Sequence, residues 1–400
     1  MLEAHIRPAR RREPVSIVTV FNDEAVRRAC LDRSIEAHRA EAPSVEYVPV
    51  SNRDGAFASA GAALNHGAAH CRHDYLVFVH QDVYLHSLTA LEEAAGILAD
   101  NKSIGLLGAV GVTSDGRFFG RVRDRVFLLG DPAAQPTPVD CVDEALFMIP
   151  RRLLQREPLT EHPDFAWHAY AVEYGLRARS TGLRVCAVDI PLTHNSLTVN
   201  LERLDVAYAA LAAAHPDAVP VMTPQGIVGA PPRLRDRTNA LSTYRWRYRW
   251  LLESRDARAG SKATGGTPCV LADIRMDVDE LLRQLASDSP LLVVNIDRHR
   301  SFMDEQPGPL SIMRARRAIR VASAPLDEVA ETIARFAPRG PALMTNLDLA
   351  ELGRLASQLP SERRIIGFRT SIGYWLLIGV TPNATPDIWR SRPATPLGST

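Results

Sequence analysis

The chain has 400 residues, a formal net charge of +1 and 46% hydrophobic residues. This length suggests two domains of ordinary size, each able to bury a core. The near-neutral charge gives no general affinity for nucleic acid or for membrane surfaces. The 5 cysteines are far apart and show no C-x-x-C spacing, which argues against a disulfide framework or a structural zinc site and favours a reducing compartment.

The N-terminal end gives no sign of a targeting or membrane segment. No apolar segment follows the arginines of residues 7–12, and no apolar run approaches the roughly 20 residues that span a bilayer. We therefore expect a cytoplasmic protein without a membrane span. We interpret residues 1–13 as a solvated basic tail, with an electrostatic contact to phosphate or lipid as the alternative.

The first half of the chain alternates predicted strands and helices. Strands are predicted at Val15–Phe21, residues 45–50, Tyr75–Val79, residues 104–112, residues 145–149 and residues 183–188, and helices at residues 25–38, 58–71, 88–99 and 170–180. Asn22, Asp23 and Glu24 offer a cap for the first helix, and Gly182 follows the last one. This alternation predicts an α/β fold, in which a mixed, mostly parallel sheet carries helices on both faces.

The second half divides less clearly. We expect the first domain to occupy residues 14–256, with a helical and aromatic extension from about residue 200. A linker is predicted at residues 257–268, a smaller α/β domain at residues 269–380, and an irregular tail at residues 381–400. Residues 244–250 alternate aromatic and basic side chains. We expect the aromatic rings to cover the core while the arginines point outward. The alternative is that the rings stack on nucleic-acid bases or lie at a lipid interface.

Polar side chains end the most apolar strand. His80, Gln81 and Asp82 directly follow Tyr75–Val79. Ligands of open α/β sheets bind at the carboxyl ends of strands, and a carboxylate there suits Mg²⁺ or Mn²⁺. His80 is either a second ligand or a hydrogen-bonding support. The alternative is that Asp82 caps the following segment and His80 is an ordinary rim histidine.

Four stretches in order resemble nucleotide-diphospho-sugar transferases of glycosyltransferase family 2, of the GT-A fold, in the streptomycin-biosynthesis-type branch. They are VSIVTVFND, FASAGAALNHGAAHCRHDYLVFVHQDVYL, IGLLGAVGV and WHAYAVEYGLRARSTGLRVCAVDIPLTHNS. The second contains the D-x-D-type element as H-Q-D, and the fourth resembles the acidic catalytic helix with its closing histidine. The resemblance covers about half of the chain and leaves the C-terminal domain out.

The resemblance implies a metal-dependent glycosyltransferase that uses Mn²⁺ or Mg²⁺. It places the metal on Asp82, with His194 and His80 as further ligands; a loop histidine in solvent is the alternative for His194. The nucleotide sugar is expected near residues of the first strand, the following turn, the small-residue helix and the H-Q-D element: Val20, Phe21, Asn22, Asn52, Asp54, Asn65 and Gln81.

The acidic helix lacks one carboxylate. Inverting transfer needs a base for the acceptor proton, and the position where the family has an aspartate is Ala171 here. Glu173 or His168 is a candidate replacement, and so are Asp143 and Glu144, which precede the strand at residues 145–149. Otherwise the domain binds a nucleotide sugar without transferring it.

Three functions therefore compete. The first is inverting transfer from a UDP-, GDP- or dTDP-sugar to an unknown acceptor hydroxyl. The second is a degenerate sugar-nucleotide-binding or scaffolding protein, favoured by Ala171. The third is nucleic-acid or membrane binding through residues 244–250, which the neutral charge disfavours, so no nucleic-acid partner is expected.

Overall fold

The protein is described from a computed structural model that covers residues 11–124, 126–195, 202–229, 270–273, 290–298, 319–338, 340–358, 365–370 and 373–379. The chain forms two units, Met1–Arg125 with Leu129–Ala230 (unit 1) and Val126–Leu128 with Pro231–Thr400 (unit 2). The predictions for most of the basic tail, for residues 244–250, for the linker at residues 257–268 and for the tail at residues 381–400 lie outside the described residues.

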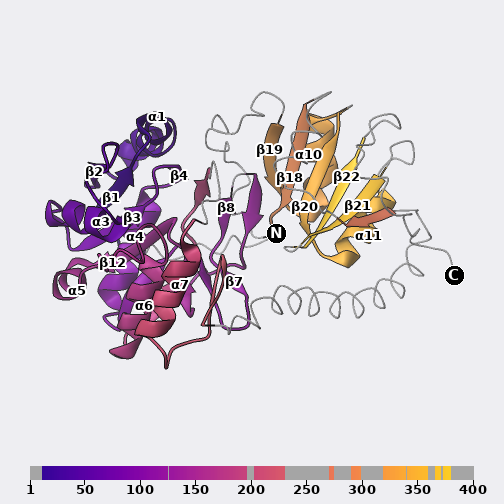
Figure 1. The fold of residues 1–400 in the computed structure, drawn as a ribbon. Coiled ribbons are helices and arrows are strands. Elements are labelled where there is room, and N and C mark those ends of the chain that lie inside the picture. Colours follow the sequence, from indigo (N-terminus) through magenta and orange to yellow (C-terminus); the bar gives the residue numbers. More distant parts are fainter. Residues whose placement is uncertain are drawn as a thin grey trace. The chain divides into compact units, whose positions relative to one another are not determined.

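Unit 1 is built on a seven-stranded sheet of order β10-β13-β5-β12-β3-β1-β2 (Figure 1). Its strands are β1 (Val15–Phe21), β2 (Glu46–Ser51), β3 (Tyr75–Val79), β5 (Ile104–Gly108), β10 (Thr137–Pro138), β12 (Leu146–Pro150) and β13 (Arg184–Ala187). Strand β1 is parallel to β2 and β3, β13 is parallel to β5, and β12 is antiparallel to both β3 and β5. All strands except β10 and β12 therefore run the same way, which confirms the mixed, mostly parallel sheet.

Helices cover both faces of this sheet, as predicted. They are α1 (Glu24–Arg27), the π-helical turn η1 (Arg28–Asp32), α2 (Arg33–His38), α3 (Ala60–Ala69), α4 (Thr89–Asp100), α5 (Arg151–Arg156) and α6 (Tyr170–Ser180). Alternate residues of a strand point to opposite faces. Val77 of β3 belongs to the core cluster that includes residues of η1, α2 and α4, whereas Leu76 and Phe78 belong to the cluster that includes residues of α3, α5 and α6.

A second sheet of order β4-β14-β8-β9 carries residues that the sequence reading left without structure. Its strands are β4 (Val83–Leu85), β8 (Val122–Asp124), β9 (Phe127–Leu129) and β14 (Leu192–His194). Strand β14 is antiparallel to β4, with His194 opposite Val83, and parallel to β8, with His194 opposite Asp124. This register brings the turn before β4 and the ends of β8 and β14 together.

Short elements complete unit 1. A three-stranded sheet has the order β11-β6-β7, with β6 (Gly111–Val112), β7 (Phe118–Phe119) and β11 (Cys141–Val142). Helix α7 (Leu204–Ala214) and the hairpin of β15 (Val221–Thr223) and β16 (Gly226–Val228) follow. The predicted strand at residues 104–112 is thus split between β5 and β6. Strand β12 is reversed because no helix connects it to β5, and a parallel crossover needs one.

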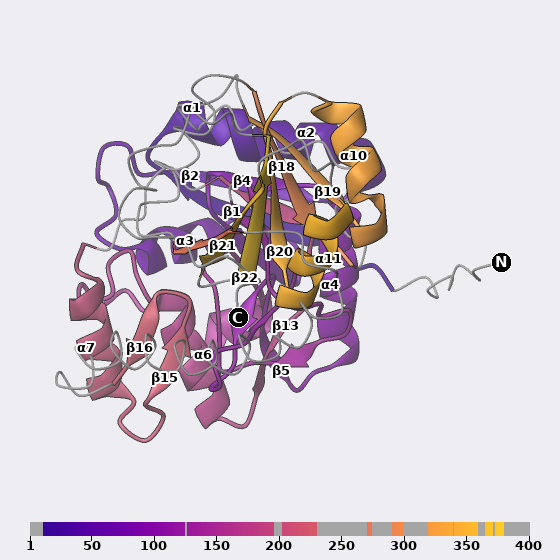
Figure 2. The same ribbon diagram turned by 90° about the vertical axis from the view of Figure 1, so that its right-hand side faces the viewer.

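Unit 2 contains a separate six-stranded sheet of order β17-β21-β22-β20-β18-β19 (Figure 2). Its elements are β17 (Val270–Asp273), β18 (Leu291–Ile296), β19 (Ile319–Ala324), η4 (Leu326–Glu328), α10 (Val329–Phe336), β20 (Ala342–Leu347), α11 (Leu349–Gln358), β21 (Ile365–Thr370) and β22 (Gly373–Ile378). Val294, Val329 and Leu352 are fully buried in one cluster, so strand and helix side chains share a core. The expected smaller α/β fold is confirmed.

Two further expectations concern the described part of the chain. Cys30, Cys71, Cys141 and Cys186 are all buried and unpaired there. Among the described helices, none combines the length and apolar character that crossing a membrane requires.

The contact of α3 with the sheet requires a glycine. An added Cβ at Gly67 would lie 2.5 Å from Val18 Cγ1 and 2.8 Å from Val50 Cγ2. We expect Gly67→Ala to destabilise unit 1 by about 1–3 kcal/mol in denaturant unfolding, because overpacking outweighs the helix propensity gained. Gly353→Ala in α11 is the control, since nothing lies within 4 Å of its added Cβ. Equal stabilisation by both substitutions would contradict the packing argument.

Candidate active site

Three side chains that can hold a metal ion meet at the carboxyl end of β3. His80 and Asp82 lie in the turn between β3 and β4, and His194 ends β14. One ligand atom from each lies within 4.8 Å of the other two. The antiparallel pairing of β14 with β4 produces this meeting, since it sets His194 opposite Val83. The sequence therefore predicted three residues that the fold brings together.

Each imidazole is oriented by a second partner. His194 Nε2 lies 3.4 Å from Asp82 Oδ1, and its Nδ1 lies 3.2 Å from Asp124 Oδ1. His80 Nε2 lies 3.2 Å from the hydroxyl of Tyr170. A carboxylate that accepts one ring N–H leaves the other nitrogen free to act as a ligand. The Asp124 contact thus directs His194 Nε2 toward Asp82.

The charges of this group depend on one another. Burial alone would raise the pKa of Asp82, but the nearby His194 and His80 lower it to about 2. Burial opposes protonation of His194, yet Asp82 and Asp124 raise the pKa of His194 well above its usual value. Burial lowers the pKa of His80 despite Asp82. A partly buried carboxylate is therefore kept ionised by a neighbouring cation.

The donor atoms fit a divalent cation. Two imidazoles and one carboxylate suit Mn²⁺, whereas Mg²⁺ favours sites made of oxygen ligands alone. The side chains of Asp82 and His194 keep 18% and 22% of their surface exposed, so an ion and a ligand can reach them. A bound divalent cation would take the place of the proton on His194 as the positive charge beside Asp82.

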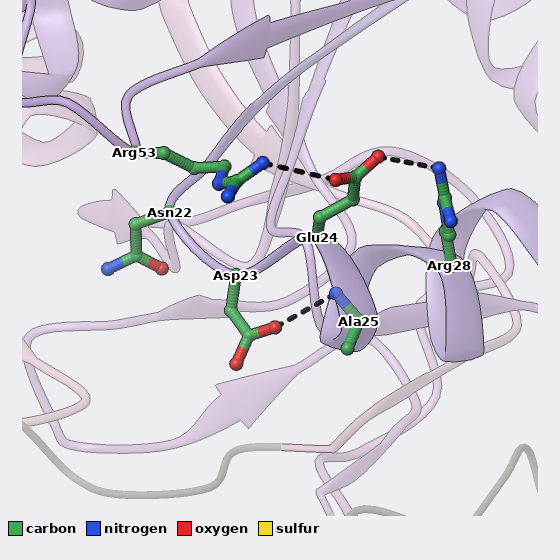
Figure 3. Close-up of a pocket in the computed structure, with 6 residues that line it drawn as sticks. All are labelled: Asn22, Asp23, Glu24, Ala25, Arg28 and Arg53. Atoms are coloured by element: carbon green, nitrogen blue, oxygen red, sulfur yellow. Dashed lines mark hydrogen bonds and ion pairs between the residues drawn. The ribbon is translucent and has the colours of Figure 1, made fainter.

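A pocket lies at the loop after β1 and the turn after β2 (Figure 3). It encloses about 500 Å³ and is lined by Asn22, Asp23, Glu24, Ala25, Arg28 and Arg53. The close-up shows Glu24 paired with both arginines, at 2.7 Å from Arg28 and 3.2 Å from Arg53. Asp23 caps α1 by accepting the N–H of Ala25.

Gln81 connects the pocket to the metal-ligand group. Its Oε1 accepts the backbone N–H groups of Asn22 and Asp23, both at 3.1 Å, and its Nε2 donates to Asn22 Oδ1. Gln81 is the residue before Asp82 in the chain. The loop after β1 is therefore tied directly to the turn that carries the carboxylate.

Glu144 occupies the start of helix α6. Its carboxylate accepts the N–H of Ala171 at 3.1 Å and also interacts with the N–H groups of Ala169 and Tyr170. Ala169 has a positive φ of 59°, which turns successive N–H groups toward the carboxylate. Burial raises the pKa of Glu144 to about 8, helped by Asp143 and opposed by these hydrogen bonds.

Tyr170 shows that the carboxyl groups share one site. Burial raises its pKa well above the usual value, and the charges of Glu144, Asp143 and Asp82 raise it further. Asp143 also influences His80. Its Oδ1 accepts the N–H of Ala145, so its side chain closes a local turn. The N–H of His80 donates to the carbonyl oxygen of Ala145 at 3.0 Å, so Asp143 and Glu144, the two residues before Ala145, lie near the metal-ligand group.

The other candidates for the base have different partners. Glu173 forms a two-point ion pair with Arg177, at 2.7 and 2.9 Å, and lies 3.4 Å from His215. His168 Nε2 lies 2.8 Å from the carbonyl oxygen of Glu202. The described contacts place neither residue with Asp82.

Among the expected nucleotide-sugar residues, only Asn22 and Gln81 have contacts that link them to the pocket. Asn52 closes its own turn through two hydrogen bonds to the backbone of Phe57, and Asn65 binds the backbone of Leu159. The remaining three, Val20, Phe21 and Asp54, lie at the end of β1 or after β2. The ring of Phe21 packs under the guanidinium of Arg27, and Asp54 is exposed.

Sequence reasoning missed Asp124 and Tyr170. Asp124 lies in a region of short strands without a readable period, and only the pairing of β8 with β14 brings it to His194. Tyr170 was visible as the start of the acidic helix, but its contact with His80 joins residues 90 apart in the chain.

Comparisons with known proteins found one family model and several solved structures. Residues 16–205 match the model of a glycosyltransferase-like family. The match covers slightly less than half of the 400 residues, so that part of the chain is similar to this family. No curated protein sequence matches the chain.

Three solved structures are among those that match parts of the chain, all with low TM-scores. The mannosyltransferase PcManGT from Pyrobaculum calidifontis, in complex with GDP-Man and Mn²⁺, is 15% identical, with 60% of this chain and 83% of that chain covered and a TM-score of 0.34. GalNAc-T7 with UDP, GalNAc and Mn²⁺ is 12% identical over 46% of this chain and 43% of that chain, with a TM-score of 0.33. Residues 1–349 of S. aureus TarS are 13% identical over 50% and 64%, with a TM-score of 0.33.

The geometry predicts a metal preference. We expect calorimetry to show tighter binding of Mn²⁺ than of Mg²⁺, because two of the three ligands are imidazoles. Asp82→Ala should abolish Mn²⁺ binding without unfolding the protein, since it removes one partly exposed carboxylate that is paired with His194. Asp100→Ala, which removes an exposed carboxylate near Arg11, is the control. Unchanged Mn²⁺ affinity in Asp82→Ala would contradict the metal assignment.

Proposed function

We propose that unit 1 is a metal-dependent glycosyltransferase that moves a sugar from a nucleotide diphosphate to an acceptor hydroxyl with inversion. The observation that carries the proposal is the group of His80, Asp82 and His194 at the carboxyl end of β3, within residues matched by a glycosyltransferase-like family. A thermal-shift screen of UDP-, GDP- and dTDP-sugars, with and without Mn²⁺, tests it, because a ligand that binds only the folded state stabilises that state.

The donor would extend from the pocket to the metal-ligand group. The pocket offers two arginines and a volume of about 500 Å³, in the range of small-molecule sites. Gln81 fixes the loop between the two features. A divalent cation held by Asp82 and the histidines would neutralise negative charge on the leaving diphosphate. The H-Q-D order of residues 80–82 also supports assignment to the streptomycin-biosynthesis-type branch.

Glu144 is the base in this proposal. The acceptor oxygen attacks the anomeric carbon as the bond from that carbon to the diphosphate oxygen breaks. The acceptor proton goes to Glu144, and the bonding electrons leave with the nucleoside diphosphate. A pKa of about 8 makes Glu144 a stronger base than an ordinary carboxylate. Glu173 is less suited, because Arg177 holds its carboxylate.

A second candidate function is sugar-nucleotide binding without transfer, and Ala171 favours it. The side chain of Ala171 is fully buried in the apolar cluster with Tyr174 and Leu64. A carboxylate at this position would therefore point into the core. Glu144 reaches the same turn of the helix from the turn between β11 and β12, which supports a relocated base over a lost one.

We expect Glu144→Gln to lower turnover by about 10²–10⁴-fold with little change in donor affinity, because the amide oxygen can still accept the helix N–H groups but takes up no proton. Turnover of the best donor from the thermal-shift screen, with an acceptor panel, measures it. Glu173→Gln is the matched control and should change turnover far less.

The pH profile provides a second readout of the same residue. Glu144 must be ionised to act as a base, and burial raises its pKa to about 8. In the wild-type protein kcat/KM should therefore rise about tenfold per pH unit below pH 8 and level off above it. Glu144→Gln should lose this rise. Full turnover in Glu144→Gln, with loss in Glu173→Gln, would move the role to Glu173.

Ala171→Asp should destabilise the protein by about 3 kcal/mol or more in denaturant unfolding and should not raise turnover, because it buries a carboxylate in an apolar cluster beside Glu144. Ala171→Ser separates the effect of polarity from that of charge and should cost less. Higher turnover in Ala171→Asp than in the wild-type protein would instead identify a retired active site that had lost only its base.

A further inference from the structure

One residue, Asn195, ties the turn that carries Asp82 to the end of strand β14. The backbone N–H of Asn195 donates to the Asp82 carbonyl oxygen at 2.9 Å, and its side-chain Nδ2 donates to the same oxygen at 3.3 Å. Asn195 directly follows His194, which belongs with Asp82 to the metal-ligand group. Two members of this group are therefore connected by hydrogen bonds that use none of their ligand atoms.

The surroundings of Asn195 are closed to solvent. Asn195 is fully buried, and its Nδ2 also donates to the sulfur of the fully buried Cys30 at 3.7 Å. Cys30 belongs to η1, the π-helical turn that packs against β4. Such turns are frequent at functional sites. The amide is thus enclosed between the Asp82 turn, the end of β14 and η1.

The amide of Asn195 can point only one way. A carbonyl oxygen accepts hydrogen bonds but cannot donate them, so the NH₂ group must face Asp82. This orientation leaves Asn195 Oδ1 buried without a hydrogen-bond partner among the described residues. A buried acceptor without a partner lowers stability, and an apolar side chain of the same shape would avoid that loss. Stability of the fold therefore does not explain an asparagine at this position.

The Asp82 carbonyl does not need the side chain of Asn195 as a partner, because the backbone N–H of Asn195 already satisfies it. A second donor on the same oxygen instead restricts how the peptide group after Asp82 can turn. The Asp82 carboxylate lies 3.4 Å from His194 Nε2. Ligand side chains bind well when supporting hydrogen bonds hold them within about 0.5 Å of the productive geometry. The Asn195 amide offers this support to the backbone that carries the carboxylate.

We propose that Asn195 is a positioning residue of the metal site: its side chain fixes the Asp82 turn against the end of β14, so that Asp82 and His194 face one point before a cation binds. The inference rests on the metal site of the proposed function. Asn195 acts through the two ligands and does not touch the cation. Hydrogen-bond partners that orient metal ligands are worth about 10–100-fold in metal affinity.

The test compares metal affinity with stability in full-length protein that carries Asn195→Leu. Leucine has nearly the shape of asparagine but offers no N–H group. We expect Mn²⁺ binding, measured by calorimetry with Mn²⁺ alone, to weaken about 10–100-fold. The denaturant midpoint of the metal-free protein should not fall, because the substitution also removes the unpaired Oδ1. A merely structural residue would lose stability and affinity together.

Thr19→Val is the matched control. Thr19 is fully buried in β1, and its Oγ1 is another buried atom without a hydrogen-bond partner among the described residues. The substitution removes a comparable polar atom from the same unit but breaks no hydrogen bond to the Asp82 turn, so Mn²⁺ affinity should match the wild-type protein. The electron paramagnetic resonance spectrum of bound Mn²⁺ is a second readout. It should broaden in Asn195→Leu, where the ligands lose their common orientation, and stay unchanged in Thr19→Val.

The outcomes separate this inference from the proposed function. Wild-type Mn²⁺ affinity in folded Asn195→Leu would overturn the positioning role and leave the metal site standing. Where that variant does not fold, Asn195→Ala, which removes the same amide without adding bulk, decides in its place. In a folded variant, a denaturant midpoint that falls together with the affinity would also overturn the role, and so would equal weakening by Thr19→Val. Absence of Mn²⁺ binding by the wild-type protein would overturn the proposed function and the inference together.

Discussion

The site depends on the pairing of β14 with β4 on one side and β8 on the other. This pairing is antiparallel to β4 and parallel to β8, so the last residue of β14, His194, lies between Asp82 and Asp124. The consequence is electrostatic as well as geometric. An imidazole between two carboxylates attracts a proton strongly, while the protein interior penalises each unpaired charge. In the proposed metal site, His194 would give up this proton when a cation binds.

A cation bound near Asp82 would offset the negative charge of the surrounding carboxyl groups. Asp143 and Glu144 lie close enough to Tyr170 and His80 to influence their protonation, and Asp82 contributes a further negative charge. A diphosphate would add more. Like charges at this density are unfavourable unless a metal ion or protons offset them. Protons are one such offset: burial, helped by Asp143, raises the pKa of Glu144 and keeps that group neutral until the pH rises. A divalent cation is the other.

Local patterns predicted the elements that have a strong period, and long-range pairing determined the rest. Strand Tyr75–Val79 and helix Tyr170–Ser180 were predicted to the residue, because apolar runs and caps are encoded locally. The position of the His80–Asp82 turn was also predicted, because this turn directly follows that strand. Asp124 was not predictable, because its strand β8 has only three residues. Only the pairing of β8 with β14 places Asp124 opposite His194. The sequence left Glu173 and Glu144 both open as the base, and the proposal of Glu144 rests on a contact with Ala171, 27 residues further along the chain.

The first turn of α6 contacts both Glu144 and His80. Its N–H groups hold the Glu144 carboxylate, and its first residue, Tyr170, places its hydroxyl 3.2 Å from His80. A helix turn is stiff, so a displacement that brought Glu144 toward an acceptor would also move the contact with His80. In the proposed mechanism, this single element would keep the base Glu144 and the metal ligand His80 in one geometry without a direct bond between them. In that arrangement a carboxylate on the helix itself is unnecessary, and the buried Ala171 instead packs the helix against the core that fixes its position.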